Sequence, residues 1–321
     1  GMTDVVDVDE LISKEMLRKE LAQKMDDLRA RINQISRKGK ESTEEERNEA
    51  REIKETIEHM STEVADATEA VYQLMLWIPN FVDERVPLGG EENNQIIRNV
   101  GEIPKFDFQP KPHFDLGVDL GVIDFERGVK IAGPRFYFLK GALVKMRRAL
   151  TEMFEHHLEK QGFIPVSPPL LVKEKTLYGT GYLPFATKAN FKIEGEDLTL
   201  IGTSEQPLIT QHMDEILDAD QLPLKYVGES ECFRTEAGSH GRDTRGLMRV
   251  HQFYKTEQIV FCRPEDSEEW HQKTLANEEW ILKELGIPYQ VVLTAIKDLA
   301  PFGNIKYDLE AWIPSQCKYR E

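Results

Sequence analysis

Charged and aromatic residues within one short stretch have the types and the spacing needed to hold a nucleotide. Residues 233–257 read FRTEAGSHGRDTRGLMRVHQFYKTE. Alternate residues of a strand point the same way, so we expect one face of an incoming strand to carry Arg234 and Glu236. The same rule predicts that one face of the returning strand carries His251, Phe253, Lys255 and Glu257. The intervening loop supplies tight backbone and phosphate-binding cations through Gly238, Gly241, Gly246, Arg242, Arg245 and Arg249.

The spacing along this predicted hairpin indicates an order of ligand groups. Phe253 and Glu257 lie four strand positions apart, roughly 13 Å at about 3.3 Å per residue. The ring could stack on a base, and the carboxylate could bind an ammonium or hydroxyl group, with Arg234 on a phosphate between them. A surface hairpin with an ordinary ladder of salt bridges is the alternative interpretation of these charges alone.

Composition narrows the class of protein. The 321-residue chain exceeds the usual size of a single core, so two domains are expected. A net charge of −16 argues against a general nucleic-acid coat and against an anionic membrane surface. No apolar run reaches membrane-spanning length, and no membrane partner is expected. The cysteines Cys232, Cys262 and Cys317 lack metal or disulfide spacing, which is typical of a cytoplasmic protein.

The region from residue 8 to 76 is rich in charged residues, and its apolar residues recur at spacings of three and four. This is the pattern of an antiparallel helical hairpin, a coiled coil whose first helix extends roughly 45 Å. Residues 39–43 reverse the chain, and Ser42 or Thr43 is the expected N-cap of the second helix. The expected seam consists of Leu17, Leu21, Met25, Leu28, Ile32, Ile35, Ile53, Ile57, Met60, Val64, Ala67, Val71 and Leu74.

The outer end of this arm is basic. No acidic residue occurs from Leu28 to Lys40, whereas the cations Arg29, Arg31, Arg37, Lys38 and Lys40 do. Such a run is either a solvated helix face or a local site for phosphate groups on an otherwise acidic protein.

The rest of the chain predicts an α+β fold. Residues 79–112 are expected to form a linker, followed by helices at 139–161 and 265–285. Strands are expected at 198–203, 226–236, 250–262, 289–294 and 307–313, many of them as antiparallel hairpin partners. Neither a phosphate-binding glycine–lysine loop nor a strand-linked G-x-G-x-x-G is present, which excludes the common nucleotide folds. We place one domain at residues 1–100 and the other at 101–321.

Residues 233–257 resemble the second signature of class II aminoacyl-tRNA synthetases, in the form found in seryl-tRNA synthetases. Further similarity follows in order along nearly the whole chain, at residues 133–141, 162–169, 177–184, 203–205 and 307–314. The resemblance implies a class II antiparallel sheet flanked by helices, with the tRNA-binding coiled-coil arm at the N-terminus. It also implies a homodimer, because residues 162–169 match the first signature.

The activity implied by the resemblance is that of a serine–tRNA ligase, in which ATP activates L-serine and the seryl group passes to tRNA(Ser). The implied ATP site comprises Arg234, Thr235, Glu236, Phe253 and Glu321, with Arg234 as the catalytic residue and Glu321 holding Mg²⁺. The implied serine site comprises Thr203, Ser204, Glu205, Arg234 and Glu257. The implied tRNA contacts are Arg29, Arg31, Arg37, Lys38 and Lys40.

The resemblance stops before the third class II signature. Both ends look truncated, so we expect the C-terminal part of the fold to be missing and activity to be well below that of an ordinary synthetase. A non-catalytic synthetase-like protein that binds RNA or acts as a scaffold is the alternative, although its drift should have damaged Arg234, Glu236 or Phe253. A carrier-protein aminoacylating relative would lack the helical arm.

Overall fold

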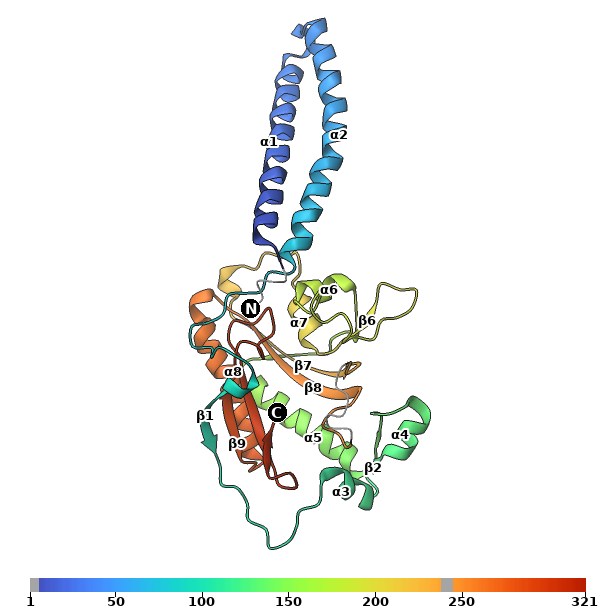
Figure 1. The fold of residues 1–321 in the computed structure, drawn as a ribbon, viewed down its shortest axis with the longest axis vertical. Coiled ribbons are helices and arrows are strands. Elements are labelled where there is room, and N and C mark those ends of the chain that lie inside the picture. Colours follow the sequence, from blue (N-terminus) through green and yellow to red (C-terminus); the bar gives the residue numbers. More distant parts are fainter. Residues whose placement is uncertain (1–5, 238–244) are drawn as a thin grey trace. The chain divides into compact units, whose positions relative to one another are not determined.

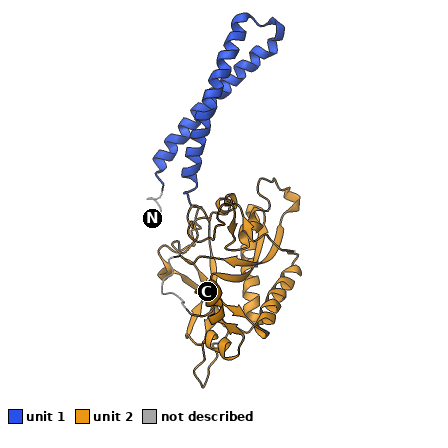
Figure 2. Cartoon of the chain, turned by 90° about the vertical axis from the view of Figure 1, so that its right-hand side faces the viewer, with its two compact units in different colours: residues 1–79 blue, residues 80–321 orange. Residues whose placement is uncertain are grey.

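The computed structural model describes residues 6–237 and 245–321 and divides into two compact units, Gly1–Pro79 and Asn80–Glu321 (Figure 2). The division falls at the end of the helical arm. The domain boundary expected from the sequence lay near residue 100 instead.

The first unit is the expected helical hairpin (Figure 1). Helix α1 spans Val8–Lys38, a 3₁₀ turn spans Gly39–Glu41, and α2 spans Glu44–Met75. Thr43 is the N-cap of α2. Its hydroxyl accepts from the Glu46 amide while the Glu46 carboxylate accepts from the Thr43 amide, so two otherwise unpaired donors are satisfied.

The seam between α1 and α2 follows the predicted spacing with one error. Met25, Ile35 and Ile53 are buried, and Leu11 extends the seam toward the start of α1. Leu17 was predicted to lie on the seam, but it is 51% exposed. Leu17 does not keep the spacing that joins Leu11 to Met25, and this places it on the outer side of α1.

The second unit is α+β, as predicted (Figure 1). Its helices are α3 His113–Asp119, α4 Phe125–Ala132, α5 Ala142–Glu159, α6 Glu174–Gly179, α7 Glu205–Thr210 and α8 Ser267–Glu284. Its 3₁₀ turns are Glu91–Asn93, Ala219–Gln221 and Pro264–Asp266. Its strands are β1 Gln95–Val100, β2 Ile123–Asp124, β3 Phe138–Leu139, β4 Ile164–Val166, β5 Leu171–Val172, β6 Thr199–Leu200, β7 Leu224–Phe233, β8 Gln252–Phe261, β9 Tyr289–Leu293, β10 Tyr307–Ile313 and β11 Lys318–Arg320.

Two sheets organise this unit. One has the order β1-β9-β10-β11 with antiparallel pairing throughout, and the other has the order β4-β7-β8, in which β4 runs parallel to β7 and β7 antiparallel to β8. The short pairs β2-β3 and β5-β6 are antiparallel.

Each sheet is covered by a helix on one face (Figure 1). Helix α5 packs on β7 and β8 through the buried residues Leu158, Phe163 and Val227. Helix α8 packs on β9 and β10 through Leu275 and Tyr289. The opposite face of β7 and β8 is thereby left to carry polar side chains.

Several sequence predictions of element bounds need correction. The predicted linker contains β1, which pairs with β9, so this part of the linker is a strand of the sheet. Strand β7 ends at Phe233 rather than at residue 236, and β8 begins at Gln252 rather than at residue 250. Strand β6 covers only two of the residues expected at 198–203. Within the described residues, no helix is both long enough and apolar enough to cross a membrane.

Candidate functional site

The hairpin of β7 and β8 presents the predicted ligand-binding face. Phe253, Lys255 and Glu257 alternate along β8, as expected. Their partners across the pair are the small residues Cys232, Ser230 and Gly228. Long side chains on β8 can therefore lie over β7 without steric conflict.

Arg234 and Phe253 lie on the same side of the hairpin. The Arg234 guanidinium carbon lies 5.2 Å from the centre of the Phe253 ring. Arg234 Nε donates to the Gly202 carbonyl at 3.0 Å, and its amide donates to the His251 carbonyl at 3.0 Å. The guanidinium is thus oriented from two sides, which suits a fixed positive charge at a phosphate.

Glu236 reaches the same region by a different route from the one predicted. It lies beyond the end of β7 with a φ of 51°, so strand alternation does not place it beside Arg234. Its carboxylate instead forms an ion pair with Arg249 Nε at 3.3 Å. The contact links the two limbs of the hairpin just outside the paired strands.

These residues line one cavity of about 1080 Å³. Arg234, Glu236, Phe253 and Glu321, all predicted to bind ATP, contribute to its wall. The complete lining is Glu91, Arg234, Glu236, Leu247, Met248, Arg249, Val250, Phe253, Lys255, Glu310, Tyr319, Arg320 and Glu321. A nucleoside triphosphate and an amino acid together are of a size suited to such a cavity.

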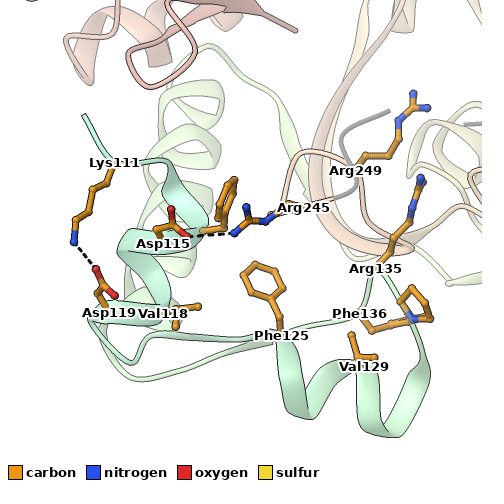
Figure 3. Close-up of a pocket in the computed structure, with 13 residues that line it drawn as sticks. Lys111, Asp115, Val118, Asp119, Phe125, Val129, Arg135, Phe136, Arg245 and Arg249 are labelled. Atoms are coloured by element: carbon orange, nitrogen blue, oxygen red, sulfur yellow. Dashed lines mark hydrogen bonds and ion pairs between the residues drawn. The ribbon is translucent and has the colours of Figure 1, made fainter. Parts of the chain in front are cut away.

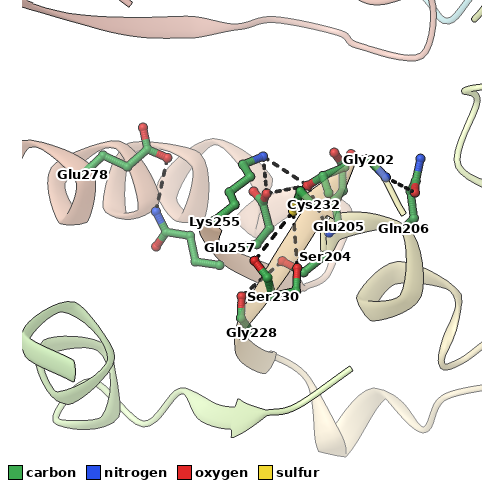
Figure 4. Close-up of polar contacts among 12 residues, drawn as sticks. Gly202, Ser204, Glu205, Gln206, Gly228, Ser230, Cys232, Lys255, Glu257 and Glu278 are labelled. Carbon is green, nitrogen blue, oxygen red and sulfur yellow. Dashed lines mark hydrogen bonds and ion pairs between the residues drawn. The ribbon is translucent and has the colours of Figure 1, made fainter. Parts of the chain in front are cut away.

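A polar cluster lies next to the Lys255 side of the cavity (Figure 4). Thr203 Oγ1 donates to Glu257 Oε2 at 2.9 Å and accepts from Lys255 Nζ at 3.1 Å, while Lys255 also forms an ion pair with Glu257. Thr203 is fully buried, and the Glu257 side chain is 19% exposed. The cluster is therefore rigid and partly shielded from water.

Glu205 adds a second carboxylate to this cluster. Burial, reinforced by the negative charge of Glu257, raises the pKa of Glu205 above its ordinary value. Tyr182 donates its hydroxyl to Glu205 Oε2 at 3.1 Å. Two carboxylates beside Lys255 and Arg234 can bind a ligand that carries an ammonium group, a hydroxyl group and a carboxylate.

Two other predicted residues are engaged elsewhere. The buried Ser204 hydroxyl donates to the Gly228 carbonyl at 3.1 Å and fastens the start of α7 to β7 (Figure 4). Thr235 donates its hydroxyl to the Lys188 carbonyl, and its amide donates to the Ala189 carbonyl at 3.0 Å. Neither side chain lines the cavity. Their ligand-binding roles stay predictions.

Glu321 is the residue predicted to hold Mg²⁺. Its side chain is 70% exposed and lies 3.8 Å from Lys306 Nζ. Glu310, to which the sequence assigned no role, also lines the cavity and accepts from Gln290. No group of three or more potential metal ligands occurs within residues 6–237 and 245–321. Sparse carboxylates in a phosphate-sized cavity nevertheless fit Mg²⁺, which prefers a few carboxylates together with substrate phosphates.

The basic end of the arm is largely paired with acidic residues. Arg31 donates to both carboxylate oxygens of Glu49 at 2.7 Å, Lys38 pairs with Glu46, and Arg29 lies 3.4 Å from Asp26. Arg37 and Lys40 have no ion pair within the described residues. The absence of acidic residues from 28 to 40 did not reveal this pairing, because α2 supplies two of the partners.

Sequence reasoning missed the roles of several residues. Lys255 was placed on the correct face without a function, although its spacing from Phe253 and Glu257 was the available signal. Tyr182 gave no such signal. His251 precedes β8 and donates Nδ1–H to the Arg234 carbonyl, a structural contact. Predicted loop residues Gly238, His240, Gly241 and Arg242 lie outside the described residues.

Comparisons with known proteins identify both units. Residues 2–82 match the family model of the seryl-tRNA synthetase N-terminal domain. Residues 188–321 match that of the tRNA synthetase class II core domain (G, H, P, S and T).

Individual relatives agree with the family models. A serine–tRNA ligase of Methanocella arvoryzae is 40% identical over 98% of this chain and 76% of its own length. The crystal structure of seryl-tRNA synthetase from Pyrococcus horikoshii, complexed with ATP, has a TM-score of 0.87 and 38% identity, covering 98% of this chain and 76% of that one. The cytoplasmic serine–tRNA ligase of Naegleria fowleri, solved with AMP, has a TM-score of 0.82 and 34% identity, covering 98% and 74%.

Proposed function

The chain belongs to the seryl-tRNA synthetase family, and we propose that it activates L-serine with ATP and transfers the seryl group to tRNA(Ser). The observation that carries the proposal is the shared face of the hairpin. Arg234 and Phe253 adjoin one another there, and Lys255 and Glu257 continue the row toward Thr203.

The adenine end of ATP would lie between Phe253 and Glu236. The Phe253 ring offers a stacking surface, and the Glu236 carboxylate can accept from the exocyclic amino group of adenine. Arg249, which holds Glu236 at 3.3 Å, lines the same cavity and can bind phosphate oxygens.

Serine would occupy the cluster beneath the α-phosphate. Glu205 and Thr203 suit its ammonium group, Glu257 suits its hydroxyl, and Arg234 together with Lys255 suits its carboxylate. A carboxylate aimed at a hydroxyl discriminates against alanine, because alanine leaves that carboxylate without its partner.

The first step forms a bond between a serine carboxylate oxygen and the α-phosphorus of ATP and breaks the bond from that phosphorus to pyrophosphate. Negative charge builds up on the α-phosphate oxygens, and the preoriented guanidinium of Arg234 stabilises it. Serine's carboxylate is already ionised, so this step needs no general base. In the second step a ribose hydroxyl of the tRNA 3′ end attacks the seryl carbonyl carbon, and AMP leaves.

Glu321 would hold Mg²⁺ at the phosphate end of the cavity, where the ion would neutralise phosphate charge. The helical arm would bind tRNA(Ser) through shape and backbone contacts. Given the pairing of Arg31 and Lys38, Arg37 and Lys40 are the cations most ready to contact phosphate. A homodimer in the cytoplasm completes the proposal.

The test is the amino-acid dependence of pyrophosphate exchange into ATP. We expect exchange with serine, and neither alanine nor threonine should replace it. Arg234→Ala should abolish the serine-dependent signal, whereas Arg263→Ala, a matched arginine on the loop after β8, should retain it. Exchange that is independent of serine, or that survives Arg234→Ala, contradicts the proposal.

A further inference from the structure

Helix α3 contacts the limb of the hairpin that returns to the nucleotide cavity. The Leu247 amide donates to His113 Nε2 at 2.8 Å. Beside this hydrogen bond, the Arg245 guanidinium carbon lies 4.3 Å from the centre of the Phe114 ring, and Arg245 reaches Asp115 at 3.5 Å (Figure 3). Three successive residues of α3 thus touch the limb formed by residues 245–249.

The fit between this limb and α3 is tight. Gly246 has a φ of 88°, and a Cβ built there would lie 2.3 Å from His113 Nε2 and 2.9 Å from Phe114 Cδ1. Any larger residue would push the imidazole away from the Leu247 amide. Glycine is needed here for both its backbone conformation and its lack of a side chain.

The limb leads directly into the proposed ATP site. Leu247, Arg249 and Val250 line the nucleotide cavity, and Arg249 also holds Glu236. Arg249 additionally lines a second cavity of about 700 Å³ between α3, α4 and the limb (Figure 3). A shift of the limb at His113 would therefore move cavity-lining residues two and three positions farther along the chain.

We propose that His113 is a positioning residue for nucleotide binding: its neutral imidazole accepts the Leu247 amide and fixes residues 245–249, so that Arg249 enters the ATP cavity correctly placed. This inference rests on the proposed function. It assigns to α3, which contributes no side chain to the nucleotide cavity, an effect on ATP affinity.

The protonation state of His113 is consistent with this role. Burial lowers the pKa of His113 below its ordinary value of 6.5. Neutral imidazole can accept through Nε2, whereas imidazolium has only donors. The charged groups that face this ring are Asp115 on its own helix and Arg245 on the limb. The clamp is therefore complete at neutral pH and is lost as the pH falls through the lowered pKa of His113.

The experiment measures the affinity for ATP with Mg²⁺ by calorimetry between pH 5 and pH 8. His113→Phe keeps a ring but has no acceptor, and we expect it to weaken ATP binding about three- to tenfold at pH 7.5, the loss of one hydrogen bond. His113→Gln keeps an acceptor that does not titrate. It should bind ATP nearly as the wild type does at pH 7.5 and should keep that affinity at pH 5, where the wild type weakens. His156→Phe, an exposed histidine on α5, is the matched control.

The outcomes separate the clamp from the proposed function. A wild-type protein that does not bind ATP refutes the proposed function itself. A wild type that binds ATP while His113→Phe has the same affinity and the same pH profile refutes the clamp alone. If His113→Phe fails to fold, Gly246→Ala displaces the ring without removing it. This variant should likewise weaken ATP binding, and unchanged affinity there overturns the inference.

Discussion

Replacing Lys255 by methionine should destabilise the protein by an amount that depends on pH. Lys255 pairs with Glu257, whose side chain is 19% exposed, and donates to Thr203 Oγ1 at 3.1 Å. Losing a charged hydrogen bond in this setting costs about 1.5–3 kcal/mol at neutral pH. For a unit of this size that corresponds to a decrease in Tm of roughly 3–10 °C.

The pH dependence follows from Glu205. Burial raises the pKa of Glu205, and the charge of Lys255 opposes that rise, so removing Lys255 should raise the pKa further. A group whose folded pKa lies above its unfolded value contributes stability below the unfolded value and loses it as the pH rises through the folded pKa. The deficit of Lys255→Met should therefore be small near pH 4.5 and complete near pH 8.

Urea unfolding at both pH values measures this deficit. Lys175→Met is the control, because Lys175 pairs with Asp214 at 2.7 Å while both side chains are largely exposed. Such a surface pair contributes about 0–1 kcal/mol. A Lys255→Met deficit equal at both pH values, or no larger than the control's, would refute the reasoning.

Two further predictions concern the serine cluster and the arm. Tyr182→Phe removes the hydroxyl that holds Glu205, so the serine KM should rise about three- to tenfold with little change in Tm; an unchanged KM contradicts this. Arg37→Ala with Lys40→Ala should weaken tRNA(Ser) binding in a gel shift and flatten its salt dependence, about 0.7–0.9 per lost phosphate contact. Arg31→Ala, which breaks an existing pair with Glu49, should do less, and an equal loss would refute the distinction.

Local patterns in the sequence predicted the features that depend on neighbouring residues. Alternation placed Phe253, Lys255 and Glu257 on one face of β8, and the capping signal placed the start of α2 at Thr43. The helical spacing gave both helices of the arm. Each of these features is decided by side chains within a few positions of one another.

The features that were missed depend on partners far along the chain. Strand β1 looked like a linker because its partner β9 follows almost two hundred residues later. Glu236 was assigned to a strand that has already ended, since its φ of 51° reflects the turn of the hairpin limb. The acidic partner of Arg31 lies on the other helix of the arm. His113 carried no signal, because its partner is a backbone amide.

The most direct test of the central claim measures how tightly the protein binds two non-reactive mimics of the adenylate, one carrying serine and one carrying alanine. If the hairpin face holds adenine, phosphate and serine in a row, calorimetry should give about 100-fold tighter binding of the seryl mimic. Glu257→Gln should reduce that preference, because the carboxylate that reads the hydroxyl is lost. Equal affinities for the two mimics, or a preference unaffected by Glu257→Gln, would contradict the account.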